Sequence, residues 1–295
     1  MVKKVLAVSG GMDSMVMLDR MLGEVLAGKI KRDELVVATF NHGTRESAKT
    51  DAEFVLKKAK ENGIKSYYGE AKLGAGVSEE KAREERYKFL REVAFKERGE
   101  IFTAHHLDDL IETIAINFLR GTGWRGLASF SSFGIRRPLI DGFFSPEEFG
   151  FKLFDKKAIL KYAAEKKIVF REDPTNSSDD YLRNRLREKT RSLDFKTKGQ
   201  VFQLWVQEKE IKREVEKILE SILPENRVYE RNWFHSLDEK SSLEFLRYIT
   251  IRANISATRP QLMDFLNAIK TYRSGKKFNL PEDKLVKLNK NEFRL

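Results

Sequence analysis

Residues 5–14, with the sequence Val-Leu-Ala-Val-Ser-Gly-Gly-Met-Asp-Ser, constrain the fold of this chain more than any other stretch. Four apolar residues predict a buried strand, and an apolar pattern with helical spacing follows the glycines. A strand, a glycine turn and a helix N-terminus direct free backbone N–H groups at an anion. The two glycines allow a phosphate to approach the backbone closely, and the two serines add hydroxyl donors. We therefore expect a phosphate-binding loop here, with Asp13 placed to hold a metal ion bound to that phosphate.

Strands and helices are predicted to alternate along the first part of the chain. Short apolar runs indicate strands at 5–8, 34–40, 65–69 and 100–104, and longer apolar periodicities between them indicate helices. This alternation predicts an α/β fold with a doubly wound, mostly parallel sheet. Such sheets bind ligands outside the carboxyl ends of their strands. Three of the four strands end in polar clusters, so we expect these clusters to meet at one edge; they lie at 9–14, 41–45 and 105–109.

Asp108, Asp109 and Glu112 begin the helix that follows the fourth predicted strand. Spacings of three and four residues place Glu112 beside both aspartates on one helical face. The helix dipole alone also favours acids in a first turn, which is the structural alternative. Three carboxylates beside His105 and His106 at a ligand-binding edge suit Mg2+ or a substrate ammonium group. A zinc site is not expected, because the chain has four histidines and no cysteine.

Charge and composition narrow the function classes. The net charge is +11 and the pI is about 9.5, which favours a polyanionic partner such as RNA. A Lys- and Glu-rich surface that serves only solubility is the other interpretation. The lack of cysteine excludes disulfides, thiolate catalysis and cysteine-ligated clusters. No stretch has the length and apolar character of a membrane span or a signal peptide, so we expect a cytoplasmic protein without a membrane partner.

Two basic segments are candidates for RNA contact. The segment 120–127 holds three glycines, a tryptophan and two arginines, Arg120 and Arg125, which suit close approach to phosphate. A flexible surface connection is its alternative. The segment 181–191 carries five basic residues against one acid, and an ordinary charged surface helix is its alternative.

The chain resembles a known family over about residues 4–190. The loop at 9–14 lacks the Walker A and dinucleotide-binding patterns and resembles the pyrophosphate loop of N-type ATP pyrophosphatases, the PP-loop superfamily. Within that superfamily the chain resembles the tRNA(Ile)-lysidine synthetases, whose motifs recur in order at 9–14, 41–47, 51–54, 82–87, 105–113, 120–127, 137–139 and 173–187. Thr44 and Leu110 depart from the leucine and glutamine that are usual in that family.

The resemblance implies a ligase that forms a carbon–nitrogen bond, on an adenine nucleotide α-hydrolase-like fold. Its substrates are ATP, with Mg2+, free L-lysine and the tRNA(Ile) whose anticodon is CAU. Oxygen 2 of the wobble cytidine is adenylated with release of diphosphate. The lysine ε-amine then displaces AMP at carbon 2, giving lysidine, so that the tRNA reads AUA instead of AUG.

The resemblance also implies roles for individual residues. ATP-binding residues are expected at Ser9, Gly10, Gly11, Met12, Asp13, Ser14, His42 and His105, with Asp13 also as the magnesium ligand. Catalytic roles fall on Asp13, Arg83, Asp109 and Glu112, and lysine recognition on Asp108, Asp109 and Glu112. The expected tRNA contacts are Arg45, Arg120, Arg125, Tyr181, Arg183, Asn184 and Arg187. An ordinary solvated arginine is the alternative for Arg83.

The chain is predicted to have two domains. Residues 1–192 form the catalytic domain, 193–199 form a linker, and 200–295 form a smaller, mainly helical domain that helps to hold the tRNA. In the second domain we expect helices at 200–223, around 243–249 and at 260–269, and short paired strands at 276–280 and 284–288. Trp205, Trp233 and Phe234 are expected in its core. A homodimer is one possible assembly.

Alternatives from other functional classes remain at this point. Another tRNA-modifying PP-loop ATP pyrophosphatase is the nearest, and a tRNA thiolase is disfavoured because such enzymes need cysteine thiols or a cluster. An amide-forming enzyme with a small-molecule substrate does not explain the basic segment 181–191. A module that only binds nucleotide or tRNA does not need the acids at 13, 108, 109 and 112.

Overall fold

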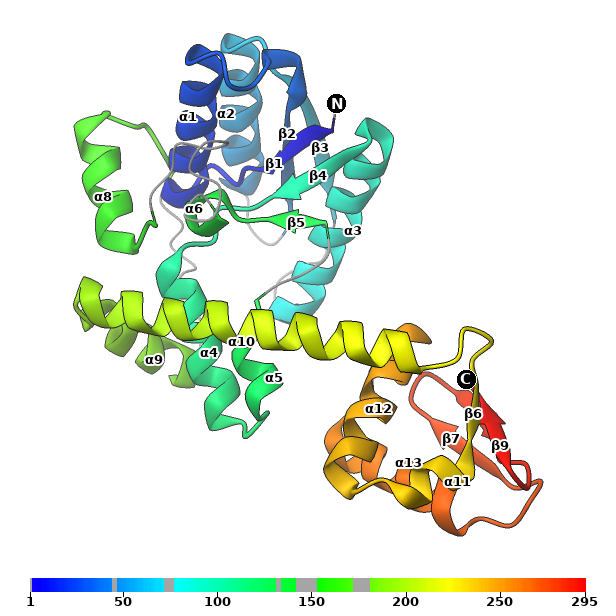
Figure 1. The fold of residues 1–295 in the computed structure, drawn as a ribbon. Helices are drawn as coiled ribbons and strands as arrows, with labels where there is room; N and C mark the ends of the chain where they lie inside the picture. The colour runs from blue at the N-terminus through cyan, green and yellow to red at the C-terminus, as the bar shows by residue number, and fades with distance from the viewer. Residues whose placement is uncertain (1, 44–46, 72–76, 131–133, 142–152, 172–180) are drawn as a thin grey trace. The chain divides into compact units, whose positions relative to one another are not determined.

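The computed structural model describes residues 2–43, 47–71, 77–130, 134–141, 153–171 and 181–295. The chain divides into two compact units, Met1–Glu208 and Lys209–Leu295. Each unit has its own buried core. Figure 1 labels the helices and strands of both units.

The first unit is built on a five-stranded parallel sheet with the strand order β3-β2-β1-β4-β5. Its strands are β1 (Lys3–Ala7), β2 (Leu35–Asn41), β3 (Lys65–Glu70), β4 (Gly99–Phe102) and β5 (Ile135–Arg136). The doubly wound parallel sheet predicted from the sequence is therefore confirmed. The fifth strand was not predicted, because two residues are too few to show an apolar pattern.

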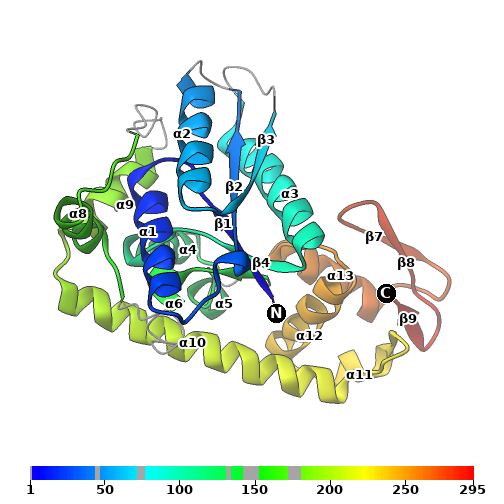
Figure 2. The same cartoon turned by 90° about the horizontal axis from the view of Figure 1, so that it is seen from above.

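Alternate residues of the central strands pack on opposite faces of the sheet. Leu6 and Val37 face a cluster with α1 (Met12–Leu26) and α2 (Ser47–Glu61). Val5 and Val36 face α3 (Glu79–Glu97) instead. Viewed from above, α1 and α2 cover one face and α3 the other (Figure 2). Because both faces are covered, the central strand β2 is buried along almost its whole length, as is usual for a parallel sheet.

Further helices of the first unit extend beyond the sheet. They are α4 (Leu107–Leu119), α5 (Trp124–Leu127), α6 (Pro138–Asp141), α8 (Lys156–Glu165), α9 (Tyr181–Ser192) and the start of α10 (Phe195–Ile222), and a short 3-10 helix covers Arg32–Glu34. Leu107, Leu110 and Ile111 of α4 share a buried cluster with Phe202 and Trp205 of α10. The Trp205 indole N–H also donates to Ser129 O at 2.7 Å.

The linker predicted at 193–199 is not observed, and this prediction is wrong. From Phe195 onward these residues are helical, and the boundary between the compact units falls later, between Glu208 and Lys209 within α10. The physical reason is that Phe202 and Trp205 bury against α4, which binds the first part of α10 to the first unit. Lys198, inside the predicted linker, is fully buried.

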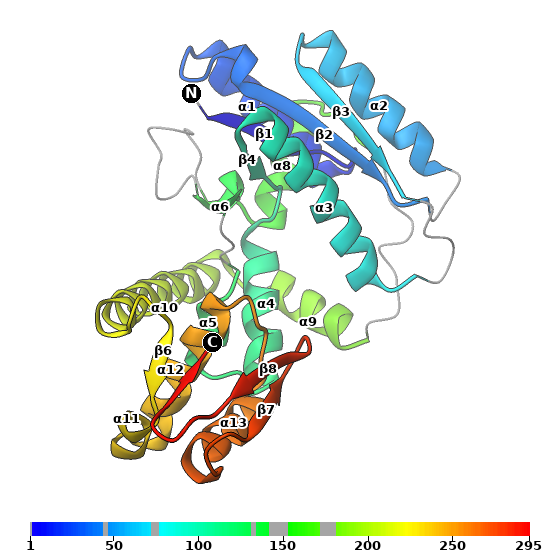
Figure 3. The ribbon, with the colours of Figure 1, turned by 90° about the vertical axis from the view of Figure 1, so that its right-hand side faces the viewer.

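The second unit combines helices with two small antiparallel sheets. Its elements are the end of α10, β6 (Val228–Glu230), α11 (Arg231–Ser236), α12 (Glu239–Arg252), α13 (Arg259–Thr271), β7 (Lys277–Leu280), β8 (Lys284–Lys287) and β9 (Glu292–Arg294). The predicted helices and the β7–β8 hairpin are confirmed (Figure 3). The β6–β9 pair, three residues a strand, was not predicted. In the core of the second unit, Phe293 packs against both Phe234 and Phe265, and Trp233 lies partly buried beside them.

Among the helices that the structure describes, none combines the length and the apolar character that crossing a bilayer requires.

Candidate active site

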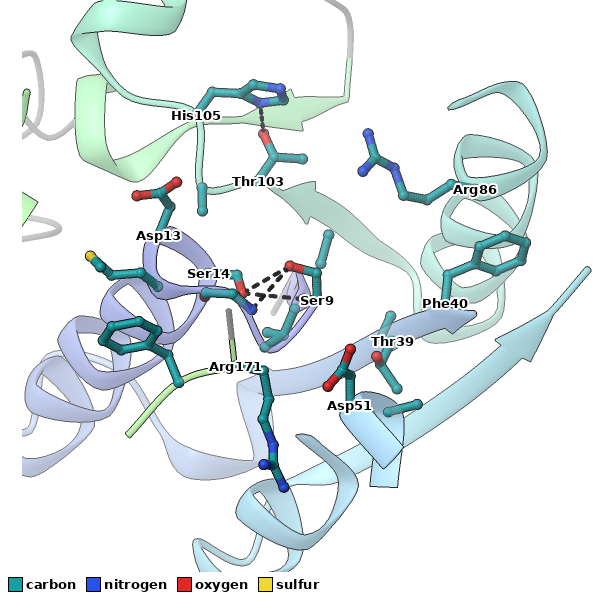
Figure 4. Close-up of a pocket in the computed structure, with 18 of the residues that line it drawn as sticks. Ser9, Asp13, Ser14, Thr39, Phe40, Asp51, Arg86, Thr103, His105 and Arg171 are labelled. Atoms are coloured by element: carbon teal, nitrogen blue, oxygen red, sulfur yellow. Dashed lines mark hydrogen bonds between the residues drawn. The ribbon is translucent and has the colours of Figure 1, made fainter. Parts of the chain in front are cut away.

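A cavity of about 680 Å3 lies at the carboxyl ends of β1, β2 and β4 (Figure 4). The strand order reverses between β1 and β4, which is where doubly wound sheets bind ligands. Residues from all three predicted polar clusters line it, including Ser9, His42 and His105. The predicted meeting of these clusters at one sheet edge is therefore observed, and the volume suits a nucleotide-sized ligand.

The loop at 9–14 is fixed by its own hydroxyl groups. Ser14 Oγ donates to Gly11 O at 2.8 Å and accepts from Ser9 N at 3.2 Å. Gly10 has a φ of +88°, a conformation that other residues rarely adopt, and its carbonyl accepts from Arg171 N at 2.9 Å. Gly11 is the N-cap of α1 and offers no side-chain cap to its first-turn N–H groups. A glycine turn with an uncapped helix N-terminus is an anion-binding arrangement.

His105 lies on the opposite wall from this loop (Figure 4). Its Nδ1 is 2.8 Å from Thr103 Oγ1. Burial lowers the pKa of His105 well below its usual value, and the positive charges of Arg137, Arg86 and Arg83 lower it further. The imidazole is therefore neutral at physiological pH and presents a hydrogen-bonding group without a charge.

Asp109 also lines the cavity, in the first turn of α4. Its Oδ2 accepts from the backbone N–H of His106 at 2.9 Å. Burial raises the pKa of Asp109, and the negative charges of Asp13 and Glu112 contribute in the same direction. The hydrogen bond and charge of His106 partly oppose this shift. Asp109 thus places a carboxyl group in the same cavity as a loop that is built for anions, which suits the binding of a phosphate group and an ammonium group close together.

The other two acids of α4 lie behind the cavity and do not line it. Asp108 is 3% exposed, and its Oδ1 lies 2.7 Å from Lys198 Nζ. Glu112 is 4% exposed, and its Oε2 lies 3.4 Å from Arg187 Nε on α9. The structure therefore places only Asp109 of the three acids at the cavity wall.

The remaining predicted site residues divide into three groups. Met12, Asp13 and Ser14 line the cavity, and Gly10 shapes the loop beside it. Arg83 does not line the cavity, and its guanidinium lies 5.3 Å from the centre of the Tyr87 ring; Arg86 lines the cavity in its place. Outside the described residues are Arg45 and the side chains of Tyr181 and Arg183.

The predicted RNA-contacting residues that the structure describes lie away from the cavity lining. Arg120 is exposed at the C-cap of α4. The Arg125 guanidinium lies 4.7 Å from the centre of the Trp124 ring. Asn184 is half-buried on α9, and Arg187 is the partner of Glu112 described above.

Lys156 is a cavity residue that the sequence interpretation missed. It is the first residue of α8, and its Nζ lies 2.5 Å from Asp13 Oδ1. Asp155 caps the helix by accepting from Ala158 N at 2.9 Å. A signal was present in the sequence, because Lys156 and Lys157 follow a capping aspartate in a first turn, where the helix dipole disfavours cations.

Magnesium fits this site only together with a phosphate ligand. Within the described ranges, no three His, Asp or Glu side chains gather closely enough to hold a metal ion by themselves. The Asp13 side chain is 36% exposed and lines the cavity, so its oxygens are accessible. Mg2+ typically binds through one or two carboxylates and substrate phosphates, and Asp13 suits such an ion.

Comparison with known proteins places these observations in a family. A family model described as a PP-loop domain matches residues 2–192. The tRNA(Ile)-lysidine synthase of Enterococcus faecalis is 36% identical over 194 residues, which cover 64% of this chain and 40% of that enzyme. That of Bdellovibrio bacteriovorus is 37% identical over 206 residues, covering 67% of this chain and 59% of the relative.

A solved structure shares the fold. The U34-tRNA thiolase NcsA from Methanococcus maripaludis, with its [4Fe-4S] cluster, superimposes with a TM-score of 0.55 and 18% identity over 71% of each chain. The chain spans about half the length of the two synthases, and the whole second unit, Lys209–Leu295, lies outside the residues that the family model matches.

Proposed function

The chain belongs to the PP-loop domain family, and we propose that it is an ATP-dependent tRNA(Ile)-lysidine synthase. In the proposed reaction, oxygen 2 of the wobble cytidine attacks the α-phosphate of ATP and releases pyrophosphate. The ε-amine of free lysine then attacks carbon 2 and displaces AMP. The names of the relatives support this substrate, and the chain's own cavity supports the chemistry.

The observation that carries the proposal is that the loop at 9–14 and Asp109 line one cavity. Backbone N–H groups at the start of α1 would bind the leaving pyrophosphate, whose negative charge increases as the bond to the α-phosphate breaks. Asp13 would hold Mg2+ on that group, and the ion would supply charge neutralisation. Neutral His105 adds no positive charge of its own to the opposite wall.

The acids of α4 support lysine as the second substrate. Asp109 presents its carboxylate to the cavity, and Glu112 adds negative charge behind it. An ammonium group is attracted by both acids. The attacking ε-amine has an ordinary pKa of about 10.4 and must lose a proton before it reacts, which desolvation in this cavity favours.

The basic segments support a tRNA partner. A net charge of +11 raises the encounter rate with a polyanion, and Arg120 is exposed beside the first unit's helix α4. We assign the second unit, Lys209–Leu295, to holding the tRNA as well, on the basis of its position after the catalytic unit in the chain. The tRNA substrate, ATP and free lysine place the reaction in the cytoplasm.

The test is incorporation of labelled lysine into a transcript of tRNA(Ile) with a CAU anticodon, in the presence of ATP and Mg2+. We expect incorporation that disappears when the wobble cytidine is replaced by uridine. Lysine incorporation that is the same with cytidine and with uridine at the wobble position contradicts the proposal. Release of pyrophosphate with the transcript but without lysine incorporation points instead to another tRNA-modifying reaction of the same superfamily.

A further inference from the structure

Lys156 brings a positive charge to the cavity from outside the phosphate-binding loop. Its Nζ lies 2.5 Å from Asp13 Oδ1, although the two residues are 143 positions apart in the chain. Its side chain is 20% exposed and lines the cavity. The ammonium group therefore lies next to the residue proposed to hold Mg2+ on the nucleotide.

A buried ionic network positions the backbone of Lys156. Asp108 Oδ2 accepts from the backbone N–H of Lys156 at 2.6 Å. Lys198 Nζ lies 2.7 Å from Asp108 Oδ1 and 2.9 Å from Asp155 Oδ2, so one ammonium joins the two acids. The three side chains of this network are 1%, 4% and 5% exposed. The network fixes the start of α8 against α4 and α10.

The free-energy cost of burying this ionic network indicates that the N-terminus of α8 must be held at one defined position. Removing three charged groups from water is expensive, and apolar side chains would hold two helices together at least as well. The hydrogen bonds of Lys198 raise its pKa despite burial, and the hydrogen bonds of Asp155 lower the pKa of that acid despite burial. Lys198 and Asp155 are therefore charged, and together with Asp108 they hold the N-terminus of α8 at the cavity.

The position of Lys156 is unfavourable with respect to its own helix and is balanced by the contact with Asp13. Lys156 lies at the N-terminus of α8, where the helix dipole repels a cation. Asp13 compensates for this charge, but a metal ion on the nucleotide would compete with Lys156 for the same carboxylate. The Lys156 ammonium is then available for the phosphate oxygens, which are its natural partners.

We propose that Lys156 is a further phosphate-binding residue, which contacts the pyrophosphate part of ATP, and that Asp108 is its positioning residue. This inference rests on the proposed ATP site and deepens it. It also gives Asp108 a role that differs from lysine recognition, since both carboxylate oxygens of Asp108 face the network. A nearby ammonium stabilises the leaving pyrophosphate more strongly than it stabilises bound ATP, because the leaving group gains negative charge.

Direct binding measurements with the full chain test this proposal. Titration calorimetry at saturating Mg2+ compares pyrophosphate, ATP and AMP as ligands for the wild type, Lys156→Ala, Lys156→Arg and Lys157→Ala. Lys157 is the matched control, because it is the next residue of α8 and is exposed. We expect Lys156→Ala to weaken pyrophosphate and ATP about tenfold to a hundredfold, the value of one charge-assisted hydrogen bond, and AMP less than about twofold. Lys156→Arg should recover most of the loss, and Lys157→Ala should bind as the wild type does.

The alternative is that Lys156 only neutralises Asp13 until the metal ion arrives. In that case Lys156→Ala binds pyrophosphate as tightly as the wild type at saturating Mg2+, and this result overturns the proposal. Equal weakening of AMP and pyrophosphate overturns it too, because a general disturbance of the cavity would explain both. A wild type that binds neither ATP nor pyrophosphate contradicts the ATP site and the inference together.

Asp108→Asn tests the positioning role. The amide retains an acceptor for the Lys156 backbone but removes the charge that Lys198 faces. We expect pyrophosphate affinity to fall about threefold to tenfold with AMP affinity unchanged, because the ammonium of Lys156 is less well placed. Unchanged pyrophosphate affinity in a folded variant contradicts that role. None of these measurements uses tRNA or lysine, so a wild type that binds pyrophosphate but makes no lysidine contradicts the proposed function alone.

Discussion

Arg187 Nε on α9 lies 3.4 Å from Glu112 Oε2 on α4, and the acid is almost completely buried. This contact ties the predicted RNA-contacting helix to the helix that carries the predicted lysine-recognising acids. The Arg187 side chain is 29% exposed, so it is not fully enclosed by its contact with Glu112. A residue expected from the sequence to contact tRNA therefore also organises the site.

Arg187→Ala should destabilise the first unit and weaken lysine use together. It leaves the buried Glu112 without one charged partner, which costs about 1–3 kcal/mol. The free energy of unfolding from urea titration and the KM for lysine measure the two effects. Arg185→Ala is the control, since Arg185 is exposed on the same helix. Loss of tRNA binding with unchanged stability and unchanged KM for lysine would assign Arg187 to RNA contact alone.

Asp13→Ala should reduce formation of the adenylated tRNA at least about a hundredfold, because it removes the carboxylate proposed to hold Mg2+ next to the loop. Pyrophosphate release in the presence of the transcript measures this step without lysine. Asp33→Ala is the control, since the Asp33 side chain is 77% exposed and distant in the chain from the loop. Full pyrophosphate release by Asp13→Ala would remove the proposed role.

Gly10→Ala should destabilise the loop, whereas Gly11→Ala should not strain the backbone. Gly10 has a φ of +88°, where an alanine costs about 1–2 kcal/mol, and its added Cβ would lie 3.4 Å from Val55 Cγ2. Gly11 has a φ of −69°, and an added Cβ would meet only Ser9 Oγ, at 3.5 Å. The unfolding free energies of the two variants measure the difference. Equal values would show that the loop relaxes around Gly10.

His105 should make the folded protein sensitive to mild acid. Its pKa is lowered in the folded state, so below about pH 6.5 the unfolded chain binds a proton that the folded chain does not. Stability from this group is therefore complete above pH 6.5 and decreases as the pH falls towards the folded pKa. Urea titrations between pH 5 and 7.5 on the wild type and His105→Gln measure it. The difference in unfolding free energy between the wild type and His105→Gln should decrease as the pH falls. A difference that does not change with pH contradicts a neutral, buried imidazole.

The parts of the site that were predictable from the sequence are local ones. Ser9 to Ser14 form a contiguous strand–turn–helix pattern, and the parallel sheet then brings His42 and His105 to the same edge by topology. Lys156 was not found because its partner, Asp13, lies 143 residues away. Arg86 was missed in favour of Arg83 because both arginines lie on one helix, and only packing decides which one meets the cavity.

Lys198 is an example from the fold of a contact that could not be predicted from the sequence. A lysine in a polar stretch predicts an exposed linker, because lysines are almost never fully buried unless paired. Its two acidic partners, Asp108 and Asp155, come from distant parts of the chain and become neighbours only in the folded unit. The apolar residues Phe202 and Trp205 later in α10 belong to the same unit, which moved the boundary from the predicted 193–199 to after Glu208.

Trp205→Ala tests that boundary. Trp205 is 2% exposed, packs against Phe202 and donates its indole N–H to Ser129 O at 2.7 Å, so truncation should destabilise the first unit by about 3–5 kcal/mol. Leu204→Ala is the matched control, because Leu204 is the neighbouring residue of α10 and is 45% exposed; its cost should be below about 1 kcal/mol. Hydrogen exchange with mass spectrometry assigns the effect to a unit. If the boundary lies after Glu208, Trp205→Ala speeds exchange in α4 while exchange in α12 and α13 is unchanged; faster exchange confined to α12 and α13 would place Trp205 with the second unit instead.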